Sequence, residues 1–117
     1  MTELSEKTKQ QLWHLRQPVK LDESTELRPL YYPALRYFSV QLWKGGALAG
    51  LLGEVGQYTH PDDVLDDVDG FLVERGERPL GDDQLAHLGG GLIVAKGGPD
   101  LTMLAHALEH PETFRIL

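Results

Sequence analysis

The amino-acid sequence predicts a mainly α-helical fold, a compact domain of about four to five short helices with at most a minor strand pair. Two observations favour this class. Apolar residues recur at helical spacing through most of the chain, and a clear apolar–polar alternation is confined to residues 36–43. An α+β fold is the alternative, if residues 36–43 and 91–96 form strands. The clearest helical stripe lies in residues 61–75 and consists of Val64, Leu65, Val68, Phe71 and Leu72.

The first part of the chain divides into a polar helix and a proline-containing segment. Residues 3–17 have a thin apolar side, and Pro18 ends this helix because the residue before a proline avoids helical backbone angles. Residues 18–33 contain three prolines and are expected to be an extended or irregular linker. We therefore divide the single domain into an N-terminal helix with an extended arm, residues 1–32, and a compact helical body, residues 33–117.

The middle of the chain holds one ambiguous segment and one predicted helix. Residues 36–43 alternate as a strand does, yet Leu35, Phe38 and Leu42 suit a helix equally well, so both structures stay open. Residues 48–58 return to helical spacing, with glycines that would let another backbone approach closely. Because the next helix follows almost at once, the two are expected to pack as an antiparallel hairpin.

The helix at residues 61–75 also carries signals at both of its ends. Pro61 suits the first turn, where a missing N–H costs nothing. Thr59 and Asp62 are spaced as an N-terminal capping pair, and Gly76 stands where a helix commonly ends.

The last third of the chain is expected to add two helical segments. Residues 85–95 keep a helical period despite three consecutive glycines, and a short helix followed by a strand at 92–95 is the competing interpretation. A turn at residues 97–100 begins a helix that ends at His110, before a proline. Residues 113–117 are so apolar that we expect them to pack on the body or against a partner.

The composition is that of a soluble globular protein. The 117 residues are 41% hydrophobic and include no cysteine, which excludes disulfides and cysteine-based zinc sites. No apolar run reaches the roughly 18 residues of a membrane span, and the N-terminus lacks the apolar core of a secretory signal. A cytoplasmic protein with no membrane contact is therefore expected.

The net charge of −7 is concentrated in residues 54–83, which hold ten acidic residues against two arginines. The rest of the chain is nearly neutral. Such a field repels nucleic acid and favours a basic protein surface or a divalent cation.

The leading candidate site is the acidic helix at residues 61–75. On a helical wheel, Asp62, Asp66 and Asp69 form a stripe opposite the apolar side, and Val73 lies among them. An apolar side chain ringed by carboxylates is typical of a contact surface for a basic partner. The tail would add a second contact through Phe114, Ile116 and Leu117.

The same region offers an alternative as a magnesium site. Carboxylates from consecutive helical turns are the hard oxygen ligands that Mg²⁺ prefers, and the ion then bridges to phosphate. The candidate ligands are Glu54, Asp63, Asp66 and Asp67. Their arrangement resembles the acidic helices of the all-helical nucleotide pyrophosphohydrolases, although Gln57 stands where a second acid of the first helix would be needed. This resemblance implies a magnesium-dependent hydrolase.

Two further motifs have simpler explanations. His106, Glu109 and His110 have the H-x-x-E-H spacing of the inverted zinc proteases, but only seven residues follow and could supply the missing ligand. Histidines at a helix C-terminus are explained by the helix dipole. The last helix and the tail together resemble a helix-turn-helix, but the chain lacks the basic face that DNA binding requires.

We therefore predict a small acidic cytosolic protein-binding module, such as an inhibitor, an immunity-type protein or an assembly factor. It would occupy a basic surface of a partner macromolecule, without a cofactor and without direct nucleic-acid contact. The alternatives are a nucleotide or diphosphate hydrolase with Mg²⁺ as its cofactor, and a structural subunit of a homo-oligomer.

Overall fold

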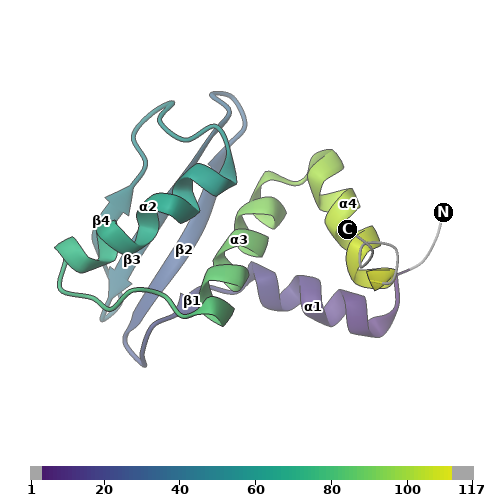
Figure 1. The fold of residues 1–117 in the computed structure, drawn as a ribbon, viewed down its shortest axis with the longest axis horizontal. Coiled ribbons are helices and arrows are strands. Elements are labelled where there is room, and N and C mark those ends of the chain that lie inside the picture. Colours follow the sequence, from purple (N-terminus) through teal and green to yellow (C-terminus); the bar gives the residue numbers. More distant parts are fainter. Residues whose placement is uncertain (1–3, 112–117) are drawn as a thin grey trace.

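The computed structural model describes residues 4–111 and shows an α+β fold (Figure 1). The elements in this range are α1 (Glu6–Arg16), β1 (Val19–Lys20), β2 (Thr25–Tyr32), β3 (Tyr37–Lys44), β4 (Ala47–Leu52), α2 (Pro61–Glu74), α3 (Asp82–Lys96) and α4 (Gly98–Glu109). The predicted mainly α class was wrong, and the α+β alternative describes the fold. The difference arises because residues 19–52 form one four-stranded sheet.

The sheet is an antiparallel meander in the order β1-β2-β3-β4. β2 pairs with β3 along all eight of its residues, so residues 25–32 are extended, as one of the two expectations for residues 18–33 had it, but they belong to the sheet and are not a linker. Pro29 was the misleading signal. It lies beyond the two residues that pair with β1, on a part of β2 with a single neighbouring strand, where a missing N–H is tolerated. The predicted boundary between residues 32 and 33 falls in the loop that joins β2 to β3.

Of the ambiguous segment at residues 36–43, all but Arg36 lies in β3, and the helix predicted at residues 48–58 is replaced by β4 and a loop. Gly45 and Gly46 have φ angles of 57° and 80° and form the two-residue turn between β3 and β4. In a helix, each further glycine of this segment would cost about 0.5–1 kcal/mol relative to alanine. Gly53 and Gly56 have φ angles of 109° and 75°, which interrupt any helix in this segment, so the predicted helix and its antiparallel helical hairpin were both wrong.

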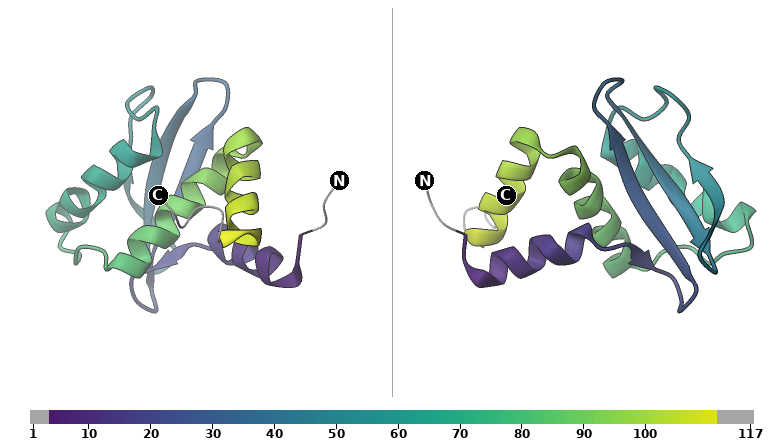
Figure 2. Two further views of the ribbon diagram at one scale, coloured as in Figure 1. Left: turned by 45° about the vertical axis from the view of Figure 1, so that its right-hand side comes forward. Right: turned by 180° about the vertical axis from the view of Figure 1, so that it is seen from behind.

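The core lies between one face of the sheet and the helices α2 and α3. From behind, the ribbon shows the strands in front with no helix drawn across them (Figure 2). The apolar side chains that lose all solvent contact come from the inner side of the sheet and from both helices: Leu27, Phe38, Val40, Leu42, Val64, Val68, Leu72, Leu88 and Leu92.

α2 is the helix predicted at residues 61–75, and its apolar stripe packs into the core as expected. It begins after His60, whose side chain makes no capping hydrogen bond, so the predicted capping pair of Thr59 and Asp62 was wrong. Its end is as predicted. Gly76 has a left-handed φ of 78°, and the N–H groups of Gly76 and Glu77 close the helix on carbonyls of its last turn.

α3 continues through the three glycines at residues 89–91, which excludes a strand at 92–95. Each glycine lies where a different part of the protein approaches. An added Cβ would lie 3.2 Å from Leu65 of α2 at Gly89, 2.6 Å from Leu15 of α1 at Gly90, and 3.0 Å from Pro29 of β2 at Gly91. The glycines therefore let α3 contact three other elements at once.

α1 and α4 lie beside α3, away from the sheet (Figure 1). The carboxylate of Glu109, in the last turn of α4, accepts hydrogen bonds from Ser5 N at 3.1 Å and from the hydroxyls of Ser5 at 3.0 Å and Thr8 at 2.5 Å. These bonds, with that from Thr8 first, lower the pKa of Glu109 below its usual range. They fasten the end of α4 to the start of α1.

Candidate functional site

The predicted acidic contact surface lies on the outer side of α2. Asp62 and Asp66 are exposed, and so is Val73, with 57% of its surface accessible. The opposite side of the helix is fixed in the core, so these groups are presented on a rigid element.

Asp69, the third aspartate of that stripe, has a structural partner. It is half-buried, and its Oδ1 accepts a hydrogen bond from the N–H of Leu80 at 2.8 Å. Leu80 lies in the loop between α2 and α3, so this bond holds the loop against the helix. The helical wheel placed Asp69 with Asp62 and Asp66, but the backbone donor comes from eleven residues further along the chain.

Asp67 is engaged in a similar way by the segment that precedes α2. The hydroxyl of Tyr58 donates to Asp67 Oδ2 at 2.6 Å, and the carbonyl of Tyr58 accepts from Phe38 N of β3 at 2.8 Å. Burial of the phenol, followed by this hydrogen bond, raises the pKa of Tyr58 to about 12. Tyr58 therefore stays neutral and links the acidic helix to the sheet.

Three of the four predicted magnesium ligands line one cavity. Glu54, Asp66 and Asp67 lie around a space of about 440 Å³ between β4 and α2, whereas Asp63 is not among its lining residues. Within residues 4–111, no group of three or more histidine or acidic side chains is arranged to hold a metal ion.

The H-x-x-E-H motif lies at the end of α4, and its acid caps α1. The rings of His106 and His110 lie 4.9 Å apart between centroids, while Glu109 is bonded to Ser5 and Thr8. The predicted tail contacts, Phe114, Ile116 and Leu117, lie outside the described residues.

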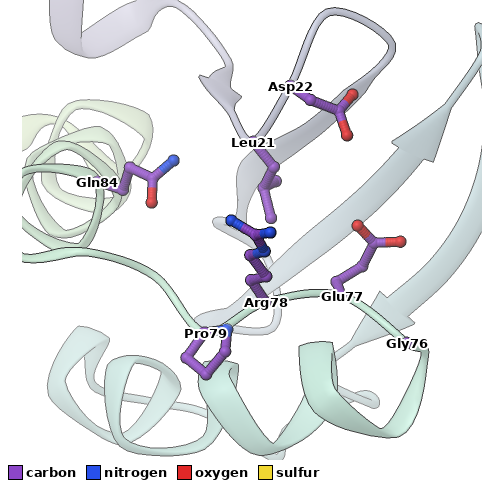
Figure 3. Close-up of a pocket in the computed structure, with 7 residues that line it drawn as sticks. All are labelled: Leu21, Asp22, Gly76, Glu77, Arg78, Pro79 and Gln84. Carbon is purple, nitrogen blue, oxygen red and sulfur yellow. The ribbon is translucent and has the colours of Figure 1, made fainter.

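A second cavity, of about 540 Å³, opens between the β1–β2 turn and the loop after α2 (Figure 3). In this view the side chain of Arg78 projects toward Leu21, with Glu77 and Asp22 on one side of it and Gln84 on the other. Both carboxylates already have partners, since Asp22 accepts from Ser24 and Glu77 forms an ion pair with Lys44. The carboxylates beside Arg78 make this cavity a poor site for an anion.

The sheet contributes a surface that sequence reasoning missed. On the face without helices, the rings of Tyr32 and Tyr37 stack at 4.5 Å, and the guanidinium of Arg28 lies 4.2 Å from the Trp43 ring centroid. At the edge of the sheet, Leu48 and Leu51 of β4 are 54% and 48% exposed. The adjacent glycines after residue 44 were the signal that could have placed a hairpin here.

No protein-family model, no curated protein and no solved structure matches this chain. Among residues 4–111, none of the helices is both long enough and apolar enough to cross a membrane.

Proposed function

We propose that this protein is a cytoplasmic protein-binding module that presents the acidic side of α2 to a basic surface of a partner protein. One observation carries the proposal. Exposed carboxylates and the exposed Val73 share the outer side of a helix whose inner side packs into the core. Rigid presentation lowers the entropic cost of association, and the carboxylates steer a basic partner by long-range attraction.

Asp62 and Asp66 are the residues that supply this steering. They are exposed, and within residues 4–111 neither forms an ion pair or hydrogen bond through its side chain. Asp69 contributes charge, but its carboxylate already accepts a hydrogen bond from the N–H of Leu80, so its main role is to hold the loop against α2. Val73 supplies apolar contact area once the partner has arrived.

The test is capture of partners from native lysate on the immobilised protein, followed by binding kinetics with the partner that is found. The double variant Asp62→Asn/Asp66→Asn is expected to associate more slowly and with a weaker salt dependence, with the fold intact and only the small loss of stability that follows from removing the Asp62 charge at the start of α2. Val73→Asp is expected to speed dissociation instead. Asp69→Ala is the comparison variant, because it removes the acceptor of the Leu80 N–H and should therefore lower the melting temperature. Wild-type kinetics in both surface variants at low salt would contradict the proposal.

A magnesium-dependent hydrolase is the second candidate, and the shared cavity of Glu54, Asp66 and Asp67 favours it. Binding of Mg²⁺ to the folded state would raise the melting temperature by mass action, and Asp66→Asn would remove that gain. A flat magnesium titration, with no turnover of nucleoside triphosphates, would eliminate this candidate.

A further inference from the structure

β4 is an edge strand that lacks two of the features that usually protect such edges, charged residues and proline. Its six residues, Ala47–Leu52, include no charged residue and no proline. Its pairing with β3 has a bulge-type register shift between Leu42 and Trp43, but residues 50–52 keep a regular register with Val40, Gln41 and Leu42. Natural edge strands are commonly guarded by lysine, by proline or by a covering element, because their unpaired backbone groups accept a further strand. Within residues 4–111, β4 pairs with β3 on one side and with no strand on the other.

The pairing of β3 shows which backbone groups of β4 face the open edge. Phe38 donates its N–H to Tyr58 on the β4 side of β3, because β2 occupies the other side. Backbone groups alternate in direction along an antiparallel strand, so Val40 and Leu42 also point at β4.

The partners of these two β3 residues point back toward β3. Leu52 is opposite Val40 and Gly50 is opposite Leu42. Leu51 lies between them, so its N–H and C=O are directed outward. Its side chain lies on the opposite face from that of Leu52, which is the face without helices.

A strand added beside Leu51 would therefore meet two different environments. Its residues on one face would lie next to the exposed Leu48 and Leu51. Its residues on the other face would lie under α2, at the 440 Å³ cavity.

The α2 side of this edge is acidic. Glu54, Asp66, Asp67 and Glu74 line the cavity with a single base, Arg75. That arginine is already engaged, since it donates to the Phe71 carbonyl at 3.2 Å, lies 3.9 Å above the Phe71 ring centroid and pairs with Glu74 at 3.7 Å. The lining therefore favours positively charged side chains.

We propose that β4 accepts an extended basic segment of a partner protein as a fifth antiparallel or parallel strand. Lysine or arginine side chains of that segment face the acidic cavity under α2, and the intervening apolar side chains contact Leu48 and Leu51. Backbone hydrogen bonds supply affinity, and the alternating environments supply selectivity. This inference deepens the proposed function, on which it rests, by naming the form of the basic partner.

Charge argues against a second copy of this chain as the occupant. Two edges paired with each other would bring two acidic cavities and two chains of net charge −7 together. Like charges at an interface disfavour association.

The experiment uses a seven-residue peptide that alternates lysine and valine, added to ¹⁵N-labelled full-length protein. The amide of Leu51 is expected to exchange with solvent more slowly when the peptide is bound, because it then donates a hydrogen bond. Leu51→Pro removes this donor and Leu51→Ala keeps it, so the proline variant should bind about tenfold more weakly than the alanine variant. A peptide alternating glutamate and valine is the charge control.

Three results would overturn strand addition. The first is binding of the lysine peptide with Leu51 amide exchange unchanged, which can be observed without any variant. The second is that Leu51→Pro and Leu51→Ala bind the lysine peptide with equal affinity, while both variants show cooperative thermal unfolding and are therefore folded. The third is equal binding of the lysine and glutamate peptides, or of neither. If Asp62→Asn/Asp66→Asn still slows association with the captured partner in any of these cases, only the strand is refuted and the proposed function stands.

Discussion

Individual side chains of this protein connect the acidic helix to its surroundings. The hydroxyl of Tyr58 donates to Asp67, the carboxylate of Asp69 accepts from the backbone N–H of Leu80, and the guanidinium of Arg75 lies over the ring of Phe71. Asp69, from the predicted contact stripe, and Asp67, a predicted magnesium ligand, are thus partly structural. The remaining exposed acids, above all Asp62 and Asp66, are those available to a partner.

Among the side chains of α2, that of Phe71 is expected to contribute most to the free energy of unfolding. It is buried, the guanidinium of Arg75 lies 3.9 Å from its ring centroid, and its Cζ would lie 3.2 Å from a Cβ added at Gly50 of β4. We expect Phe71→Ala to lower the free energy of unfolding by about 3–5 kcal/mol, as a large-to-small core substitution that leaves a cavity. Urea unfolding should show a lower midpoint with an unchanged slope. A midpoint like that of the wild type would show that the helix is not packed through this side.

Helices were more predictable than strands in this chain. α2 and α4 follow an apolar period of about 3.6 residues that depends only on local sequence. The strands β2 and β4 have no comparable local pattern. β2 contains Pro29, and β4 places Leu48, Leu51 and Leu52 at spacings that also suit a helix. Their pairing depends on partners that single-sequence patterns do not specify.

The candidate site likewise has one part that could be predicted from the sequence and one part that could not. The exposure of Asp62, Asp66 and Val73 follows from the period of one helix, so it could be derived in advance. The engagement of Asp69 by Leu80 and the open edge at β4 depend on loop position and strand order. Neither property is encoded within a single element.

The three glycines of α3 provide a test of packing at the scale of elements. Gly91 is buried, and an added Cβ would lie 3.0 Å from Pro29 Cγ and 3.1 Å from the carbonyl oxygen of Leu15. We expect Gly91→Ala to destabilise by about 1–3 kcal/mol, because α3 must move away from both β2 and α1.

Gly70 is the matched control for that substitution. It lies in the interior of α2, and an added Cβ would have no atom within 4 Å. Gly70→Ala should stabilise by about 0.5–1 kcal/mol through helix propensity alone. Thermal melts of the two variants should shift in opposite directions. A stabilised Gly91→Ala would mean that α3 does not approach β2 and α1 this closely.

At the scale of the whole molecule, the sheet with α2 and the group of α1 and α4 are joined through α3. Besides the glycine contacts, one histidine of α3 makes this connection. Nε2 of His87 lies 2.9 Å from the carbonyl oxygen of His14 and 3.1 Å from that of Gln17, at the end of α1. Because carbonyls only accept, Nε2 carries a proton and donates to both. The His87 ring also stacks on His14, with centroids 4.2 Å apart.

This connection predicts a pH-dependent stability. Burial, followed by the nearby His14, lowers the pKa of His87 below its ordinary value of 6.5. The unfolded chain then binds a proton more readily than the folded chain, so stability falls as the pH drops through 6.5 toward the folded pKa. The melting temperature should therefore be lower at about pH 5.5 than at about pH 7.5. The carboxylates with lowered pKa values, Asp22, Glu26 and Glu109, act at more acidic pH, because their ordinary values are 3.8 to 4.5.

His87→Gln isolates the contribution of this residue. The glutamine amide can still donate toward the α1 carbonyls but cannot titrate. Its melting temperature should change less than that of the wild type between the two pH values. Hydrogen exchange gives the second readout, since a protonated His87 should loosen α1 from α3 and speed exchange at the end of α1 while the amides of β3 stay protected. A variant that keeps the full pH dependence of the wild type would show that His87 is not the source of the loss of stability at acidic pH. Equal loss of protection in β3 and α1 would show that acid unfolds the whole protein and does not act on the contact between α1 and α3.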